Sequence, residues 1–159
     1  MHRAAGEPAW LFYTSGTTGR LKRVMLSHRN LAAMTACYFI DVDDITPDDA
    51  SVYAAPMSQG AGIYNFGFMA RGARHVVPAS GGFDPAELVD LSRSVGRLCM
   101  FAAPTMTKRL VDHMATQHEP PDGFKTIVYG GGPMYVQDIE HALAVMGPRF
   151  VQIYGQGCT

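Results

Sequence analysis

One stretch near the N-terminus has the side chains and backbone needed to hold phosphate groups. Two glycines bracket two threonines, further hydroxyls precede them, and a lysine follows. The residues are Thr14, Ser15, Gly16, Thr17, Thr18, Gly19 and Lys22. Glycine lets a ligand approach the main chain closely. Hydroxyls and exposed amides donate hydrogen bonds to phosphate oxygens, and lysine adds a compact positive charge. The stretch therefore predicts a phosphate-binding loop.

The pattern differs from the common nucleoside triphosphatase signature G-x-x-x-x-G-K-[ST]. Leu21 stands where that signature needs its second glycine, and Arg23 follows Lys22. Turns rich in glycine, serine and threonine are common in proteins. The composition alone therefore leaves open a hydroxyl-rich turn between two strands that binds nothing.

The order of these residues, continued by Val24 and by Leu26 to Asn30, resembles the nucleotide-binding loop of the adenylate-forming superfamily. This AMP-dependent synthetase/ligase superfamily includes the AMP-forming acyl-CoA synthetases, the luciferases and the adenylation domains of peptide synthetases. Most members have proline where Leu21 stands and glycine where Arg23 stands. These two departures make the exit from the loop bulkier and less constrained, but they keep the lysine.

Three later segments resemble the same superfamily, in its order. Residues 56–62 are similar to a segment near the acyl pocket, where many members have histidine in place of Gln59. Residues 130–134 and 154–159 are similar to the segments around the adenine base. At the second of these, Cys158 stands where the family normally has a glutamate that helps to coordinate magnesium. A thiol is a poor ligand for a hard cation, so no residue is assigned to a metal.

The resemblance implies an acid–CoA ligase that joins a carboxylic acid to AMP, using ATP and Mg²⁺, and then transfers the acyl group to coenzyme A. It implies that the loop holds the β and γ phosphates, with Lys22 and Thr18 in catalytic roles. The other implied contacts are Gln59 and Gly60 in the acid pocket, Gly131, Gly132 and Pro133 along the adenine slot, and Tyr154, Gly155 and Gln156 on the wall against which the base stacks.

By the same resemblance, residues 1–159 are expected to be part of the large N-terminal adenylation domain, without the C-terminal domain. Such a chain would lack parts needed for a full turnover. Two alternatives remain open from the residues. One is a degenerate relative that binds a nucleotide or an acyl group without catalysis. The other is a structural α/β domain whose loop binds nothing.

The composition excludes several classes of function. The 159 residues suffice for one domain with a core. A net charge of −1 provides no field for nucleic acid, and no apolar run is long enough to span a bilayer. Cys37, Cys99 and Cys158 are odd in number and far apart. They indicate reduced thiols in a cytoplasmic protein and no disulfide framework.

The periodicity predicts a β-hairpin that carries the loop at its tip, followed by alternating strands and helices. This alternation is typical of an open, mostly parallel sheet with helices on both faces. Residues 63–70 are apolar nearly all round, which predicts one buried helix. Residues 41–49 contain five aspartates without the spacing of a calcium loop, so we expect a solvated loop there. The turns after the strands should face one crevice.

Overall fold

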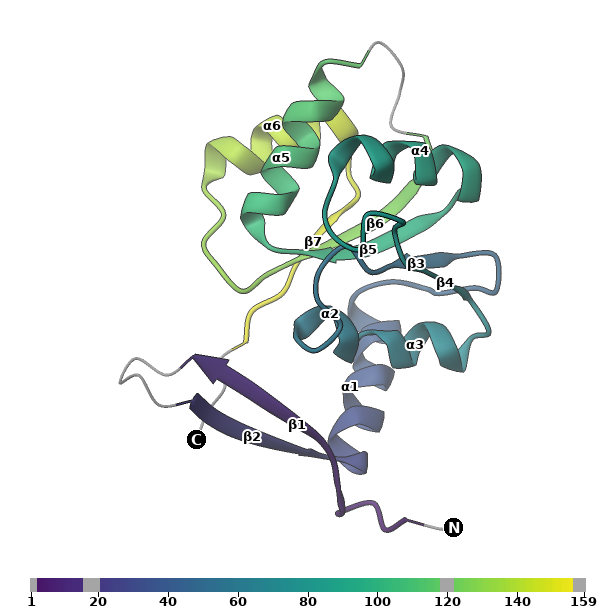
Figure 1. Ribbon diagram of the computed structural model, residues 1–159, viewed down its shortest axis with the longest axis vertical. Helices are drawn as coiled ribbons and strands as arrows, with labels where there is room; N and C mark the ends of the chain where they lie inside the picture. Colours follow the sequence, from purple (N-terminus) through teal and green to yellow (C-terminus); the bar gives the residue numbers. More distant parts are fainter. Residues whose placement is uncertain (1–2, 16–20, 118–121, 156–159) are drawn as a thin grey trace.

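The structure is a computed structural model that describes residues 3–15, 21–117 and 122–155. Within these ranges it contains a two-stranded antiparallel hairpin and a five-stranded parallel sheet with helices on both faces (Figure 1). The α/β class, the parallel sheet and the preceding hairpin, all predicted from the sequence, are confirmed.

The hairpin consists of β1 (Pro8–Ser15) and β2 (Leu21–Ser27). Phe12 lies opposite Val24, and Ser15 lies opposite Leu21. The apolar and aromatic residues of both segments favour extended backbone, which explains the pairing. Helix α1 (His28–Asp41) follows directly.

Ser27 is the N-cap of α1. Its Oγ accepts a hydrogen bond from the Asn30 backbone N–H at 3.2 Å, and its own N–H donates to Asn30 Oδ1 at 3.0 Å. These two bonds satisfy backbone donors that the first turn of a helix leaves without a partner. Leu31 and Tyr38 form the buried side of the helix.

The sheet has the strand order β4-β3-β5-β6-β7. Its strands are β3 (Ala50–Val52), β4 (Arg74–Val76), β5 (Leu98–Ala102), β6 (Phe124–Tyr129) and β7 (Phe150–Gln152). The chain leaves β3 for the edge strand β4, then crosses back to place β5 on the other side of β3. The direction of winding therefore reverses between β3 and β5.

Two groups of helices cover the two faces of the sheet (Figure 1). One face carries α4 (Pro85–Val95), α5 (Pro104–Ala115) and α6 (Val136–Met146). The other carries α1, α2 (Gly60–Ile63) and α3 (Asn65–Ala70). Alternate residues of β5 face opposite sides: Leu98 and Met100 enter the core under α4 and α5, whereas Cys99 packs with the cluster under α1 and α3. Burial on both faces explains why the strand is a continuous apolar run.

The expectation of one buried helix over residues 63–70 is wrong. Two short helices meet at Tyr64, and the side chain of Met69 is 61% exposed while Phe68 is buried. Phe68 contacts the Tyr38 ring of α1 edge-on at 6.2 Å. Helix α3 therefore buries only the side that faces α1 and the sheet. Its apolar composition predicts more burial than the structure has.

Candidate functional site

A groove of about 560 Å³ opens where several strands of the sheet end. Its walls come from both the hairpin and the sheet, together with α1, α2 and the turns after β5, β6 and β7. The residues that line it are Phe12, Tyr13, Met34, Gln59, Gly60, Ile63, Tyr64, Phe101, Ala103, Gly130, Gly131, Ile153, Tyr154 and Gly155.

The position of the groove follows from the strand order. All five strands are parallel, so their carboxyl ends lie along one edge. Open α/β sheets bind ligands outside the carboxyl ends of their strands, at the point where the winding reverses. Here that point lies between β3 and β5, and the groove contains Gln59 and Gly60 from after β3 and Phe101 and Ala103 from the end of β5.

Five of the residues predicted for binding come together in this groove. They are Gln59, Gly60, Gly131, Tyr154 and Gly155, from three separate turns. Gly132 and Pro133 follow Gly131 in the chain but do not line the groove. Phe12 and Tyr13, next to Thr14 and Ser15 on β1, do line it.

The phosphate-loop prediction falls partly outside the described residues. Thr14 and Ser15 end β1, and Lys22 lies in β2 opposite Thr14. The remaining predicted residues, Gly16, Thr17, Thr18, Gly19 and Gln156, lie outside the described residues, as does Cys158. The hairpin thus brings the two ends of the loop to the rim of the groove, beside Tyr13.

The turn after β6 exposes bare main chain to the groove. Gly131 has a φ of +83°, a conformation that side chains disfavour. A Cβ built on it would meet no atom within 4 Å, so the space above its main chain is open. The ring of Tyr154 is 87% exposed, and this residue lines the same groove. A flat ring could lie on the glycine main chain and against this tyrosine.

Part of the groove wall is apolar, and sequence reasoning did not single it out. Phe101 and Tyr64 stack with ring centroids 5.5 Å apart and an interplanar angle of 23°. Phe12, Met34 and Ile63 complete these walls. Phe101 could have been found from the sequence, because it is the next-to-last residue of a predicted parallel strand and so lies near the carboxyl edge.

The described walls of the groove provide no charged side chain to a ligand. Burial raises the pKa of Tyr64 above its ordinary value, so this phenol stays neutral at physiological pH. The sequence offers a charge for binding phosphate in Lys22, at the start of β2.

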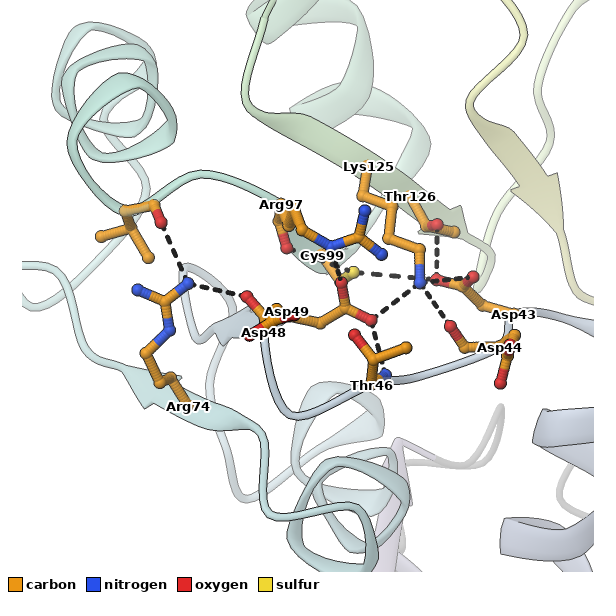
Figure 2. Close-up of polar contacts among 11 residues, drawn as sticks. Asp43, Asp44, Thr46, Asp48, Asp49, Arg74, Arg97, Cys99, Lys125 and Thr126 are labelled. Atoms are coloured by element: carbon orange, nitrogen blue, oxygen red, sulfur yellow. Dashed lines mark hydrogen bonds and ion pairs between the residues drawn. The ribbon is translucent and has the colours of Figure 1, made fainter.

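The acidic segment 41–49 lies at the opposite edge of the sheet and forms the loop that we expected, but it is only partly solvated. Asp49 is fully buried, and its carboxylate contacts Lys125 Nζ at 2.8 Å and Arg97 Nε at 2.6 Å. Lys125 Nζ also contacts Asp43 Oδ1 at 3.0 Å (Figure 2). The reason for the difference is that β5 and β6 bring Arg97 and Lys125 to this segment, and periodicity cannot predict such long-range pairing.

These ion pairs engage the carboxylates of Asp43 and Asp49. No three histidine, cysteine, aspartate or glutamate side chains of the described ranges gather in a way that could hold a metal ion. Nearby, burial and then the Asp43 carboxylate raise the pKa of the Cys99 thiol to about 12. The thiol is therefore protonated at neutral pH and is a poor nucleophile.

The fold and the groove define an open α/β protein with a ligand site at the point where the sheet changes its direction of winding. Residues 2–157 match the family model described as AMP-binding enzyme. The chain therefore belongs to the AMP-binding enzyme family, as the loop and the three later segments suggested.

The chain is similar to ligases of this family. It is 28% identical over 147 residues to a feruloyl-CoA synthase of Amycolatopsis, covering 91% of this chain and 29% of that protein. It is 30% identical over 155 residues to the fatty acid–[acyl-carrier-protein] ligase ScoC of Streptomyces coeruleorubidus, covering 93% of this chain and 29% of that protein. A malonyl-CoA ligase with methylmalonyl-CoA and AMP bound superposes with a TM-score of 0.80 at 27% identity, covering 97% of this chain and 34% of that one.

The chain thus spans about 29% of the length of these curated relatives. Among the helices of the described residues, none combines the length and the apolar character needed to cross a membrane.

Proposed function

We propose that the chain is part of an AMP-forming acid–CoA ligase. In this reaction a carboxylic acid attacks the α phosphate of ATP, pyrophosphate leaves, and the acyl group of the resulting acyl-adenylate passes to coenzyme A. The observation that carries the proposal is the gathering of Gln59, Gly60, Gly131, Tyr154 and Gly155 in one groove. Family membership and ligase relatives support it.

The described residues fit an adenine nucleotide. The open face of Gly131 and the exposed ring of Tyr154 would hold a purine between main chain and aromatic ring. Stacking of a base on an aromatic side chain is favourable for every base because each has a π face. Gly155 would continue this wall, with Gly132, Pro133 and Gln156 beside it.

The hairpin would place the phosphates. Thr14, Ser15 and the loop that follows would donate hydrogen bonds to the β and γ phosphates, and Lys22 would offset their charge. Lys22 and Thr18 would act on the transition state by stabilising negative charge that develops on the pyrophosphate leaving group. Mg²⁺ is expected to accompany ATP, because it typically binds substrate phosphates with only one or two carboxylates.

The acid would enter beside Gln59 and Gly60. The amide of Gln59 can donate and accept hydrogen bonds but cannot titrate in the physiological range. It would therefore orient a carboxylate without exchanging a proton with it.

One observation favours a second candidate, a relative that binds nucleotide without catalysis. Cys158 stands where the family normally supplies a magnesium-binding glutamate. ATP–pyrophosphate exchange detects the first half-reaction, so a positive result would exclude this second candidate. Exchange well above background from this chain alone would show that it completes the first half-reaction, contrary to our expectation that it is incomplete for turnover.

Calorimetric titration with Mg·ATP tests the phosphate site. We expect Lys22→Ala to weaken binding about tenfold, because one charge-assisted hydrogen bond contributes about 1.5–3 kcal/mol. Lys108→Ala is the matched control: Lys108 pairs with Asp138 at 2.8 Å on the surface and does not line the groove. Equal affinities for the two variants would overturn the assignment of the loop.

A further inference from the structure

We infer that a small internal cavity on the α1 side of the sheet is a binding site for one water molecule, held by the hydroxyl groups of Tyr38, Ser51 and Tyr64. The three residues come from α1, from β3 and from the junction of α2 and α3. The inference is independent of the proposed function, because this site takes neither a nucleotide nor an acid.

The first observation is the size and burial of the cavity. Its volume is about 10 Å³, which is close to the space that a single water molecule needs. Most of the residues that line it are buried, among them Val52, Phe68 and Val128. A ligand larger than water therefore does not fit between these side chains.

The second observation is a pair of phenol groups without a direct partner. The rings of Tyr38 and Tyr64 contact other rings, but within the described residues their hydroxyl groups form no hydrogen bond. Neither oxygen is among the polar atoms that surrounding side chains seal off completely, so a water molecule can reach both. Because an unpaired buried hydroxyl destabilises the folded state, a bound water is favourable here.

A nearby phenol shows the contrasting case. Tyr53 is also buried, and its hydroxyl lies 2.6 Å from His75 Nδ1 on the neighbouring strand β4. The fold therefore gives the hydroxyl of Tyr53 a side-chain partner. For Tyr38 and Tyr64, the cavity takes the place of such a partner.

The hydrogen-bonding capacities of the groups balance. Burial raises the pKa of both Tyr38 and Tyr64, so each phenol keeps its hydrogen at neutral pH and can donate it to the water oxygen. The water can donate in turn to Ser51 Oγ. That oxygen also interacts with Tyr53, but its two lone pairs leave capacity for the water. Three hydrogen bonds are typical of a buried water molecule.

The water would join elements that are far apart in the chain. It would connect α1 and β3 to Tyr64, where α2 and α3 meet. The ring of Tyr64 also stacks on Phe101 with centroids 5.5 Å apart. The same water would thus fix the orientation of Tyr64 within an otherwise apolar contact.

A crystal structure of the wild-type chain, at a resolution that shows ordered water, tests the site directly. We expect a density peak in the cavity within hydrogen-bond distance of at least two of the three hydroxyl oxygens. A cavity without such a peak, in a crystal that shows the surrounding side chains clearly, would overturn the inference.

A double-mutant cycle in urea unfolding tests the bridge in solution. Tyr64→Phe and Ser51→Ala should each raise the equilibrium constant for unfolding about tenfold, as expected for one lost hydrogen bond. Both changes disturb the same water, so we expect the double variant to raise the constant clearly less than the product of the two single effects. Agreement with that product to within about twofold would contradict a shared water.

Tyr129→Phe combined with Ser51→Ala is the matched control. Tyr129 is also buried, but its hydroxyl faces Gln152 Oε1 at 3.5 Å and it does not line the cavity. The effects of this pair should multiply. If the control pair deviates as much as the test pair, the coupling is not specific to the cavity and the inference fails. If a variant does not fold, the crystal structure of the wild-type chain decides.

Discussion

Asp49 shows how one side chain can hold three segments together. Its carboxylate accepts hydrogen bonds from Lys125 of β6, from Arg97 before β5 and from the Thr46 backbone N–H at 2.7 Å. Arg97 has a φ of +48°, in the left-handed region that non-glycine residues rarely adopt. Its pairing with a fully buried carboxylate offsets the cost of that backbone conformation.

The pKa of Asp49 makes this cluster sensitive to acid. Burial by itself raises the pKa, but the hydrogen bonds from Lys125, Thr46 and Arg97 outweigh it and lower the pKa below its ordinary value. A carboxyl whose pKa is lowered by folding stabilises the protein fully above its unfolded pKa of about 3.9. That contribution is lost as the pH falls through the lower pKa of the folded state.

We therefore expect Asp49→Asn to lower the free energy of unfolding at pH 7 by about 3 kcal/mol, because it removes a buried carboxylate from its ion pairs with Lys125 and Arg97. Its stability should also fall less than that of the wild type between pH 5 and pH 2. Urea unfolding at several pH values measures both. Asp48→Asn is the control, since the Asp48 side chain is exposed and only its carbonyl accepts a bond from Arg74. Parallel pH profiles for wild type and Asp49→Asn would contradict this explanation.

At the scale of elements, α2 positions one wall of the groove. It begins at Gly60 and brings Gln59, Gly60 and Ile63 to the groove within one turn. The turn that leads into it is tight: a Cβ on Gly62 would lie 1.7 Å from the carbonyl oxygen of Met57. Only glycine fits this backbone approach.

Gly62→Ala should consequently displace the start of α2 and destabilise the fold by about 1–3 kcal/mol, the usual cost of overpacking. Thermal unfolding gives the stability, and titration with AMP shows the effect on the groove. Gly82→Ala is the matched control, because a Cβ there meets nothing within 4 Å and its φ is not positive. A Gly62→Ala variant as stable as Gly82→Ala would show that the turn is not as tight as described.

The sequence predicts best those elements that are determined by residues close together in the chain. The hairpin strands and the alternation of strands and helices follow from neighbouring residues, and the structure confirms them. The break at Tyr64 and the burial of Asp49 depend on partners far along the chain. Local patterns contain no information about those partners.

At the scale of the whole molecule, the strand order decides where a ligand can bind. The alternation of strands and helices predicts a parallel sheet, but not that β3 lies between β4 and β5. That arrangement creates the reversal of winding beside which the groove opens. The glycine and tyrosine residues of the site could be identified from the sequence. Tyr64 and Met34 of the apolar wall could not be identified, because they come from elements that meet only in the folded chain, whereas Phe101 could have been found from its place near the end of a predicted strand.

Titration with AMP, which lacks the β and γ phosphates, tests most directly whether the groove is a nucleotide site. We expect Tyr154→Ala to weaken AMP binding about tenfold, since stacking of a base on an aromatic ring contributes about 1–3 kcal/mol. Tyr135→Ala is the control, because Tyr135 is also well exposed (70%) but lies before α6 and outside the groove. We expect this variant to bind AMP like the wild type. Equal AMP affinity of Tyr154→Ala and Tyr135→Ala would contradict the account.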